Sequence, residues 1–407
     1  MSDCLPMSDY SNLPRELLLE IFLRLPIEDL VKSTAVCKPW NSVIKNPNFI
    51  STHLQKSISS TNTNLLLFRL YTWTSEKGAR RLEYSLRSNN KALDEYKQLT
   101  CPNIDGCRSR VGSLRVAGSY NGLVCLVEDG SYGYGDTFIL WNPVIKKAIH
   151  LPEPNVTYSS HGPYDAFTGF GFDSKNNDYK LLRYVMLDTN DYEGEVPIEA
   201  EVYSLNANCW TSITSIAPKY IPLLGYPRDY GSSFVNGAIH LLAFDRIDPK
   251  RSLILAFDVS EQVFNEIPLP DPLSDEYSRP AQLLTYGQSS IAITTKESWP
   301  SSIHLWVMKE YGVATSWTKV LTKEAAESVG KVLLFKQDEQ VFVVRNDKSI
   351  ASLDIKTKHY EVLGVQAPEE YLFVDSYVES LVLLDKCCNA GWNVISIHED
   401  DANSTDE

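Results

Sequence analysis

The chain has 407 residues, with 38 basic and 52 acidic side chains and a formal net charge of −14. A protein that wraps duplex nucleic acid needs a basic face to displace counterions, so this charge speaks against that class of partner. No apolar run approaches the roughly 18 residues of a membrane-spanning helix, and the first residues lack the basic and apolar regions of a secretory signal. We therefore expect a protein of the cytoplasm, the nucleus or both, with no nucleic-acid partner and no membrane insertion.

Helical periodicity is confined to the region near the N-terminus. Apolar residues recur at helical spacing over 13–26, 27–36 and 39–46, and prolines mark the starts and ends of these stretches. Three helices in so short a segment cannot bury an independent core. We therefore expect a small all-α module over residues 10–50, which either caps the following domain or completes its apolar surface with another protein.

This segment resembles the F-box, the motif that docks onto the Skp-type adaptor of cullin-RING (SCF) ubiquitin ligases. The resemblance rests on spaced features, namely Leu13-Pro14, Leu25-Pro26, Leu30, Val36-Cys37-Lys38 and Trp40. It implies that the adaptor, and through it the cullin and RING subunits, are partners. The residues carried over by motif position to the adaptor-binding surface are Leu13, Pro14, Leu17, Ile21, Leu25, Pro26, Leu30, Val36 and Trp40. Those expected to pack the helices together are Phe22, Val31 and Ile44.

Beyond residue 64 the chain repeats a unit of four short strands. In residues 231–270 the first two strands flank an Asn-Gly pair, a strong signal for a β-hairpin. The same order recurs at 113–152, 168–216, 282–322 and 331–365. Residues 65–99 supply only three strands, and residues 377–384 read as a strand that could complete them. Six four-stranded blades would then close into a β-propeller over 65–385 that has no open edge.

The repeat length is similar to that of kelch propellers, although the double-glycine signature is absent. The propeller resembles the F-box-associated interaction domain of plant F-box/kelch-repeat proteins, a group related to S-locus F-box proteins and to F-box regulators of immune receptors. The matching segments are Tyr120-Asn121-Gly122-Leu123, Trp141-Asn142-Pro143, Phe170-Gly171-Phe172-Asp173, Asp178-Tyr179-Lys180 and residues 306–313.

Two polar segments flank the repeats. Residues 51–64 are rich in Ser, Thr and Asn, which favours a linker or a frayed extension of the last helix. Residues 386–407 end in an acidic, polar stretch that we expect to be disordered.

Strand parity predicts where the connections of the blades lie. In a four-stranded antiparallel blade, the first and third turns emerge on one face and the other connections on the opposite face. The first turns are tight, so we name their face the tight-turn face. The remaining connections include the long segments 128–136, 155–167, 188–198, 217–230, 245–251 and 271–280, which we expect together on a long-loop face.

The long segments are rich in tyrosine, which supplies large contact areas at low entropic cost. We take as candidate substrate-binding residues Tyr132, Tyr134, Tyr158, Tyr164, Tyr192, Tyr226 and Tyr230. Tyr220 and Tyr277 lie in the same segments. The alternative is that these side chains merely cover the edges of the blades.

Signatures of catalysis and of metal binding are missing from the sequence. It contains no G-x-x-x-x-G-K-[ST], H-E-x-x-H or G-x-S-x-G motif, and its eight cysteines include no CxxC pair. We therefore expect a non-catalytic protein without cofactor or metal. The favoured function is the substrate-recognition subunit of an SCF ubiquitin ligase, whose F-box holds the adaptor while the propeller captures a protein target. The alternative is a propeller enzyme or glycan-binding lectin with an incidental helical cap.

Overall fold

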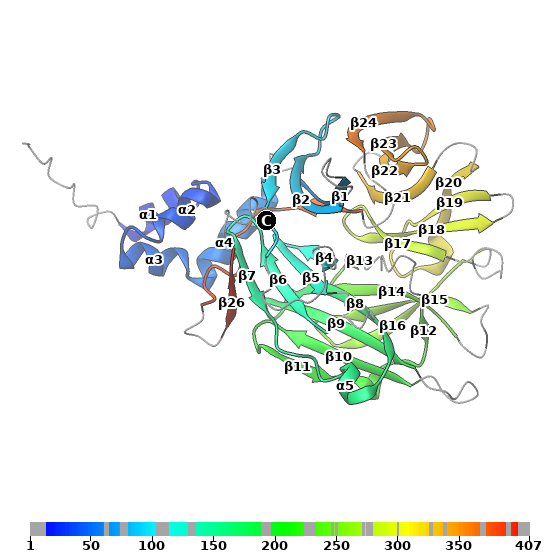
Figure 1. Ribbon diagram of the computed structural model, residues 1–407, viewed down its shortest axis with the longest axis horizontal. Helices are drawn as coiled ribbons and strands as arrows, with labels where there is room; N and C mark the ends of the chain where they lie inside the picture. The colour runs from blue at the N-terminus through cyan, green and yellow to red at the C-terminus, as the bar shows by residue number, and fades with distance from the viewer. Residues whose placement is uncertain are drawn as a thin grey trace, which may run out of the picture.

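The computed structural model describes residues 14–60, 65–73, 80–102, 114–128, 136–188, 197–223, 233–245, 248, 251–270, 273, 280–298, 301–324, 329–336, 340–366, 372–387 and 392–397. Within these residues, four N-terminal helices stand at one side of a ring of six β-sheets (Figure 1). The helices of the described part are all too short or too polar to span a lipid bilayer.

The N-terminal helices are α1 (Arg15–Phe22), α2 (Ile27–Ser33), α3 (Lys38–Ile44) and α4 (Pro47–Ser59). The first three were predicted, but α4 occupies most of the segment that was expected to be a linker. Asn46 caps α4 by accepting a hydrogen bond from the Asn48 amide at 2.9 Å, and Pro47 follows it at the first helical position. One face of α4, formed by Phe49, Ile50, His53 and Leu54, is buried. Because residues 51–64 are mostly polar, the sequence pattern did not predict that an amphipathic helix continues through residue 59.

The strands form six blades, described here from the propeller axis outward. Blade 1 contains β25 (Phe373–Tyr377), β1 (Leu65–Trp73), β2 (Arg80–Ser88) and β3 (Glu95–Leu99). Blade 2 contains β4 (Leu114–Tyr120), β5 (Leu123–Glu128), β6 (Phe138–Asn142), β7 (Lys147–His150) and β26 (Asn393–Ser396). Blade 3 contains β8 (Tyr164–Asp173), β9 (Asp178–Leu187), β10 (Ile198–Ser204) and β11 (Cys209–Ser212).

Blade 4 contains β12 (Ile221–Pro222) and β13 (Ser233–Val235), which both pair with β14 (Ala238–Phe244), and then β15 (Ser252–Asp258) and β16 (Val263–Pro268). Blade 5 contains β17 (Pro280–Tyr286), β18 (Ser290–Ser298), β19 (Ser301–Met308) and β20 (Trp317–Glu324). Blade 6 contains β21 (Val329–Phe335), β22 (Gln340–Arg345), β23 (Ser349–Asp354) and β24 (Tyr360–Gln366). The inner strands β25, β4, β8, β13, β17 and β21 contact one another in that order, and β21 contacts β25 again, so the ring is closed.

The closure of blade 1 by a strand from near the C-terminus is confirmed. β25 pairs antiparallel with β1, from Leu65 opposite Tyr377 to Arg69 opposite Phe373. The predicted strand, 377–384, was placed too late in the chain. Residues 381–384 are buried in a turn, and Leu383 adopts a left-handed conformation with φ of 75°, which is incompatible with an extended strand.

After Tyr377 the chain crosses from blade 1 to blade 2, and we call residues 378–387 the closing segment. The Asn142 side-chain amide, at the end of β6, donates hydrogen bonds of 2.9 Å to the carbonyls of Ser380 and Val382. Because Asn142 is fully buried, these bonds hold the closing segment firmly against blade 2.

The predicted disordered tail, 386–407, contains a strand. β26 pairs antiparallel with β7 and forms a fifth strand at the outer edge of blade 2, where Figure 1 shows the two side by side. Val394 and Ile395 are partly buried against the main hydrophobic cluster. Their apolar side chains and the open edge of β7 explain why this part of an otherwise acidic tail is ordered.

The predicted tight turns are present. Asn121 and Gly122 have φ values of 52° and 81°, and Asn236 and Gly237 have 52° and 74°, as a type I′ hairpin turn requires. The helical module joins the propeller on this tight-turn face, because Leu65 at the start of β1 lies opposite the end of β25. On the other face, the β18–β19 and β22–β23 connections are short, whereas the connections inside blades 2 to 4 and the steps between successive blades from blade 1 to blade 5 are longer.

His240 joins two blades from a fully buried position on β14. Its Nδ1 lies 3.0 Å from the Ser233 carbonyl, which can only accept, so Nδ1 carries the proton. Its Nε2 then accepts from the Tyr311 hydroxyl of blade 5 at 2.7 Å. Burial lowers the pKa of His240 from 6.5 to about 4, so the imidazole stays neutral in the folded protein.

Acid should weaken the fold through His240. As pH falls below 6.5, the unfolded chain takes up a proton that the folded chain refuses until its pKa of about 4, so the free energy of unfolding declines across this window. Urea unfolding at pH 7 and pH 5 should show a loss about 2 kcal/mol larger in the wild type than in His240→Gln. Parallel losses in the two proteins would show that His240 does not titrate in this way.

Candidate partner-binding surfaces

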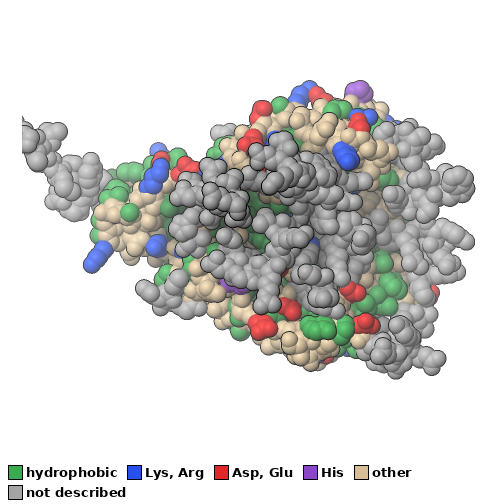
Figure 2. All heavy atoms as spheres, viewed as in Figure 1, with side chains coloured by type: hydrophobic (Ala, Val, Ile, Leu, Met, Phe, Trp, Pro, Cys, Tyr) green, Lys and Arg blue, Asp and Glu red, His purple; other side chains and the backbone are tan. Residues whose placement is uncertain are grey.

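The helical module exposes apolar side chains that its own core does not use. Leu17 and Ile21 lie one turn apart on α1 and are 53% and 46% exposed, and Val36, between α2 and α3, is 63% exposed. Phe22, Leu30 and Ile44 already fill the interior of the module. Figure 2 shows hydrophobic side chains at the surface of the module, away from the propeller. An exposed apolar face on so small a module is typical of a partner-binding site.

The other residues predicted to face the adaptor are distributed unevenly. Pro14 and Pro26 are exposed, each directly before a helix, while Leu25 is half-buried. Leu13 lies outside the described residues.

Leu30 was placed wrongly on the surface, because its side chain is fully buried within the module. Trp40 is half-buried and packs edge-to-face against Phe22 at 5.1 Å between ring centroids, so part of this ring supports the fold. Phe22 and Ile44 are buried, as expected, and Val31 is half-buried.

The helical module is packed directly onto the propeller. Phe49, Ile50 and Leu54 of α4 belong to the same buried cluster as Trp141 of blade 2. An ion pair of 2.5 Å also joins Glu28 of α2 to Lys97 of β3, and Lys97 lowers the pKa of the Glu28 carboxyl. The continuous core gives the exposed face of α1 a fixed direction relative to the blades.

On the long-loop face, the predicted tyrosines divide into three groups. Tyr158 is 51% exposed at the start of the single-turn helix α5 (Tyr158–His161) in the β7–β8 connection, as a recognition residue requires. Tyr164 is only 3% exposed and was predicted wrongly, because β8 begins at residue 164 and turns this side chain inward. The candidates outside the described residues are Tyr132, Tyr134, Tyr192, Tyr226 and Tyr230.

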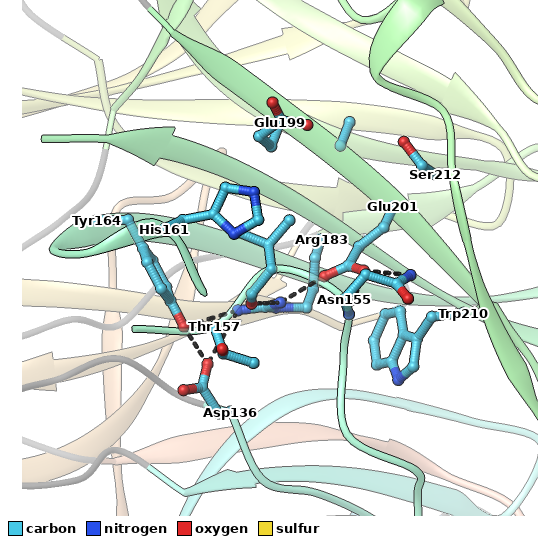
Figure 3. Close-up of polar contacts among 12 residues, drawn as sticks. Asp136, Asn155, Thr157, His161, Tyr164, Arg183, Glu199, Glu201, Trp210 and Ser212 are labelled. Carbon is cyan, nitrogen blue, oxygen red and sulfur yellow. Dashed lines mark hydrogen bonds and ion pairs between the residues drawn. The ribbon is translucent and has the colours of Figure 1, made fainter. Parts of the chain in front are cut away.

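Tyr164 belongs to a buried network around Arg183 of β9, shown in Figure 3. The Arg183 guanidinium forms ion pairs with Glu201 of β10 at 2.5 Å and with Asp136 at 3.3 Å. It also donates to the Tyr164 hydroxyl at 3.1 Å, and that hydroxyl in turn donates to Asp136. Burial raises the pKa of Tyr164 well above its usual value, so its hydroxyl keeps the proton that it donates.

The same network reaches the backbone of the β7–β8 connection. Arg183 Nη1 donates to the Val156 carbonyl at 2.8 Å, and Glu201 Oε2 accepts from the Asn155 amide at 2.9 Å. Nearby, the Trp210 indole donates to the Pro152 carbonyl at 2.8 Å. The connection that presents Tyr158 is therefore fixed from inside the protein at three points.

The sequence predictions missed Arg183 and Glu201. A visible signal was available, since Arg183 interrupts the apolar run of β9 and Glu201 stands between Ala200 and Val202 in β10. Charged residues inside two strands that pair with each other indicate a buried ion pair. Among the residues that the structure describes, no three His, Cys, Asp or Glu side chains gather closely enough to hold a metal ion.

Two domain families match this chain. Residues 10–52 match the F-box domain, and residues 80–384 match the F-box associated beta propeller domain. The F-box protein CPR1 of Arabidopsis thaliana is 28% identical over 400 residues, which cover 92% of this chain and 89% of the relative. The F-box/kelch-repeat protein At3g23880 of the same plant is 27% identical over 318 residues, which cover 76% of this chain and 79% of the relative. The chain therefore belongs to the family of F-box proteins that carry an F-box-associated β-propeller domain.

Proposed function

We propose that this protein is the substrate-recognition subunit of an SCF ubiquitin ligase of the cytoplasm, the nucleus or both. The observation that carries the proposal is the exposed apolar face of Leu17, Ile21 and Val36 on an F-box that is packed firmly onto a propeller. This face binds the Skp-type adaptor and, through it, the cullin and RING subunits. The family membership and the F-box relatives support this role.

The second surface is the long-loop face of the propeller, which captures a protein target. The F-box joins the propeller on the tight-turn face, whereas Tyr158 lies in a connection on the opposite face. Adaptor and target therefore occupy separate surfaces and bind at the same time. In this role the chain contributes no catalytic residue. It holds the target near a ubiquitin-charged enzyme, which raises the effective concentration of the two reactants.

Replacing both Leu17 and Ile21 by alanine should weaken adaptor binding about a hundredfold, because loss of one central apolar anchor commonly costs about 1–2 kcal/mol. Calorimetric titration of the full-length protein with a purified Skp-type adaptor measures the affinity. The melting temperature should stay nearly unchanged, since both side chains are exposed.

The matched control replaces Ile216 and Val263, which are 48% and 44% exposed on the propeller, and should leave the affinity unchanged. If the wild type does not bind the adaptor, or if the Leu17/Ile21 variant binds with wild-type affinity, the proposed role is wrong.

A further inference from the structure

We infer that Arg183 and Glu201 are positioning residues that hold the β7–β8 connection, and with it Tyr158, in one conformation on the long-loop face. This role rests on the proposed function, since it takes the long-loop face as the surface that meets the target. The two residues lie behind that surface and touch no solvent, with side-chain exposures of 0% and 1%.

Arg183 brings together segments that are distant in the sequence. Its Nη1 contacts Glu201 and the Val156 carbonyl, and its Nη2 contacts Tyr164 and Asp136. These groups belong to β10, to the β7–β8 connection, to β8 and to the residues just before β6. A guanidinium suits this task because its planar fork directs several donors at once, which a lysine ammonium cannot reproduce.

Glu201 binds Asn155, the residue before Val156. One carboxylate oxygen binds Arg183, and the other accepts from both the backbone amide of Asn155 at 2.9 Å and its side-chain amide at 3.1 Å. Two consecutive residues of the connection are thus bonded to one buried ion pair.

Tyr158 follows these two residues almost directly. Thr157 caps α5 by accepting from the Ser160 amide at 3.2 Å, while the Ser160 hydroxyl accepts from the Thr157 amide at 3.0 Å. The half-exposed ring of Tyr158 is therefore carried by a backbone that is already ordered. An aromatic anchor on an ordered backbone loses less entropy on binding, and this favours affinity.

A second buried cation on β9 offers a control within the same strand. Lys180 pairs with Asp173 at 2.8 Å and donates to the Val259 carbonyl of blade 4 at 2.8 Å. It lies toward the tight-turn face and makes no contact with the β7–β8 connection in the described contacts. Replacement of either cation by methionine removes a buried charge from β9, but only the Arg183 change should release this connection.

The experiment compares four variants by urea unfolding and by hydrogen exchange of the amides in 152–163. Arg183→Met should lower stability and speed exchange in this segment about tenfold or more. The double variant Arg183→Met/Glu201→Leu should regain stability, since the fully buried Glu201 carboxylate is removed together with its partner and only Asp136, which is 29% exposed, still loses an ion pair. Exchange in 152–163 should nevertheless stay fast, because the Asn155 amide and the Val156 carbonyl still lack their partners.

Lys180→Met should lower stability and leave exchange in 152–163 as slow as in the wild type. Glu201→Gln keeps a single carbonyl oxygen for two sets of donors, so it should speed exchange with a smaller loss of stability. If Arg183→Met does not fold, Glu201→Gln takes its place in the comparison with the double variant.

Two results would overturn the positioning role. Protection of 152–163 could return together with stability in the double variant, or Lys180→Met could loosen this segment as much as Arg183→Met does. In either case the ion pair would support the fold alone. Adaptor binding by all the folded variants should equal that of the wild type, so a wild type that does not bind the adaptor would reject the proposed function and leave this test unaffected.

Discussion

A chain that ends at Gln366 should fail to form the propeller, although it keeps every strand except β25 and β26. Blade 1 would lose its inner strand, which leaves the inner edge of β1 unpaired and opens a gap in the ring of inner strands between β21 and β4. The buried side chains of Val374, Tyr377, Leu381 and Leu383 would also be lost. Burial of each stabilises by about 1.5–3 kcal/mol, so the total is comparable with the whole net stability of a typical protein, about 5–15 kcal/mol.

The control is a chain that ends at Cys387, which keeps β25 and the closing segment and lacks β26. It should unfold cooperatively and lose only about 2 kcal/mol, because Val394 and Ile395 of β26 are only half-buried. Size-exclusion chromatography and urea unfolding distinguish the two truncations. A monomeric Gln366 chain with a cooperative transition would show that β25 does not close the ring.

Gly122→Ala should destabilise the protein far more than Gly237→Ala, although both glycines occupy equivalent Asn-Gly turns. Their φ values are 81° and 74°, so an alanine meets a similar backbone cost at each position, about 1–2 kcal/mol. A Cβ at Gly122 would lie 2.3 Å from Ser380 Oγ and 2.7 Å from the Val378 carbonyl oxygen, whereas nothing lies within 4 Å at Gly237. The closing segment must therefore move away from blade 2 in the first variant only.

That movement breaks the buried hydrogen bonds from Asn142 to the closing segment, so the total loss should exceed about 4 kcal/mol. Urea unfolding gives the size of the loss, and hydrogen exchange at residues 380–384 shows whether the segment is released. Equal losses in the two variants would mean that contact with the closing segment adds nothing to the cost of the turn.

The blade pattern could be predicted because its signals are local. Alternating apolar residues mark the strands, Asn-Gly pairs mark the first hairpins of the units at 113–152 and 231–270, and the incomplete first unit then requires a strand from elsewhere. The position of that strand was predicted wrongly, because residues 381–384 are as apolar as a strand and are buried in a turn instead. An apolar composition indicates that a segment is buried, but it does not determine whether the backbone forms a strand or a turn.

The candidate surfaces could be predicted only in part. The helical spacing of Leu17 and Ile21 placed both on one face of α1, and the structure exposes them. Leu30 and Tyr164 were placed wrongly because residue type alone does not determine which side of an element faces a neighbour. The ion-pair partners of Arg183 are 18 and 47 residues away along the chain: Glu201 meets it when β9 pairs with β10, but Asp136 meets it only once blades 2 and 3 have packed.

The pairing of β1 with β25 has a consequence for synthesis on the ribosome. About 300 residues separate the end of β1 from the start of β25, and at about 5–20 residues per second they take about 15–60 s to translate. Throughout this interval the inner edge of β1 has no partner, while the helices that bear Leu17 and Ile21 have already emerged. The nascent chain thus exposes the helices of its F-box before its propeller can close, and the edge of β1 stays open to pairing with other chains until the residues of β25 have been made.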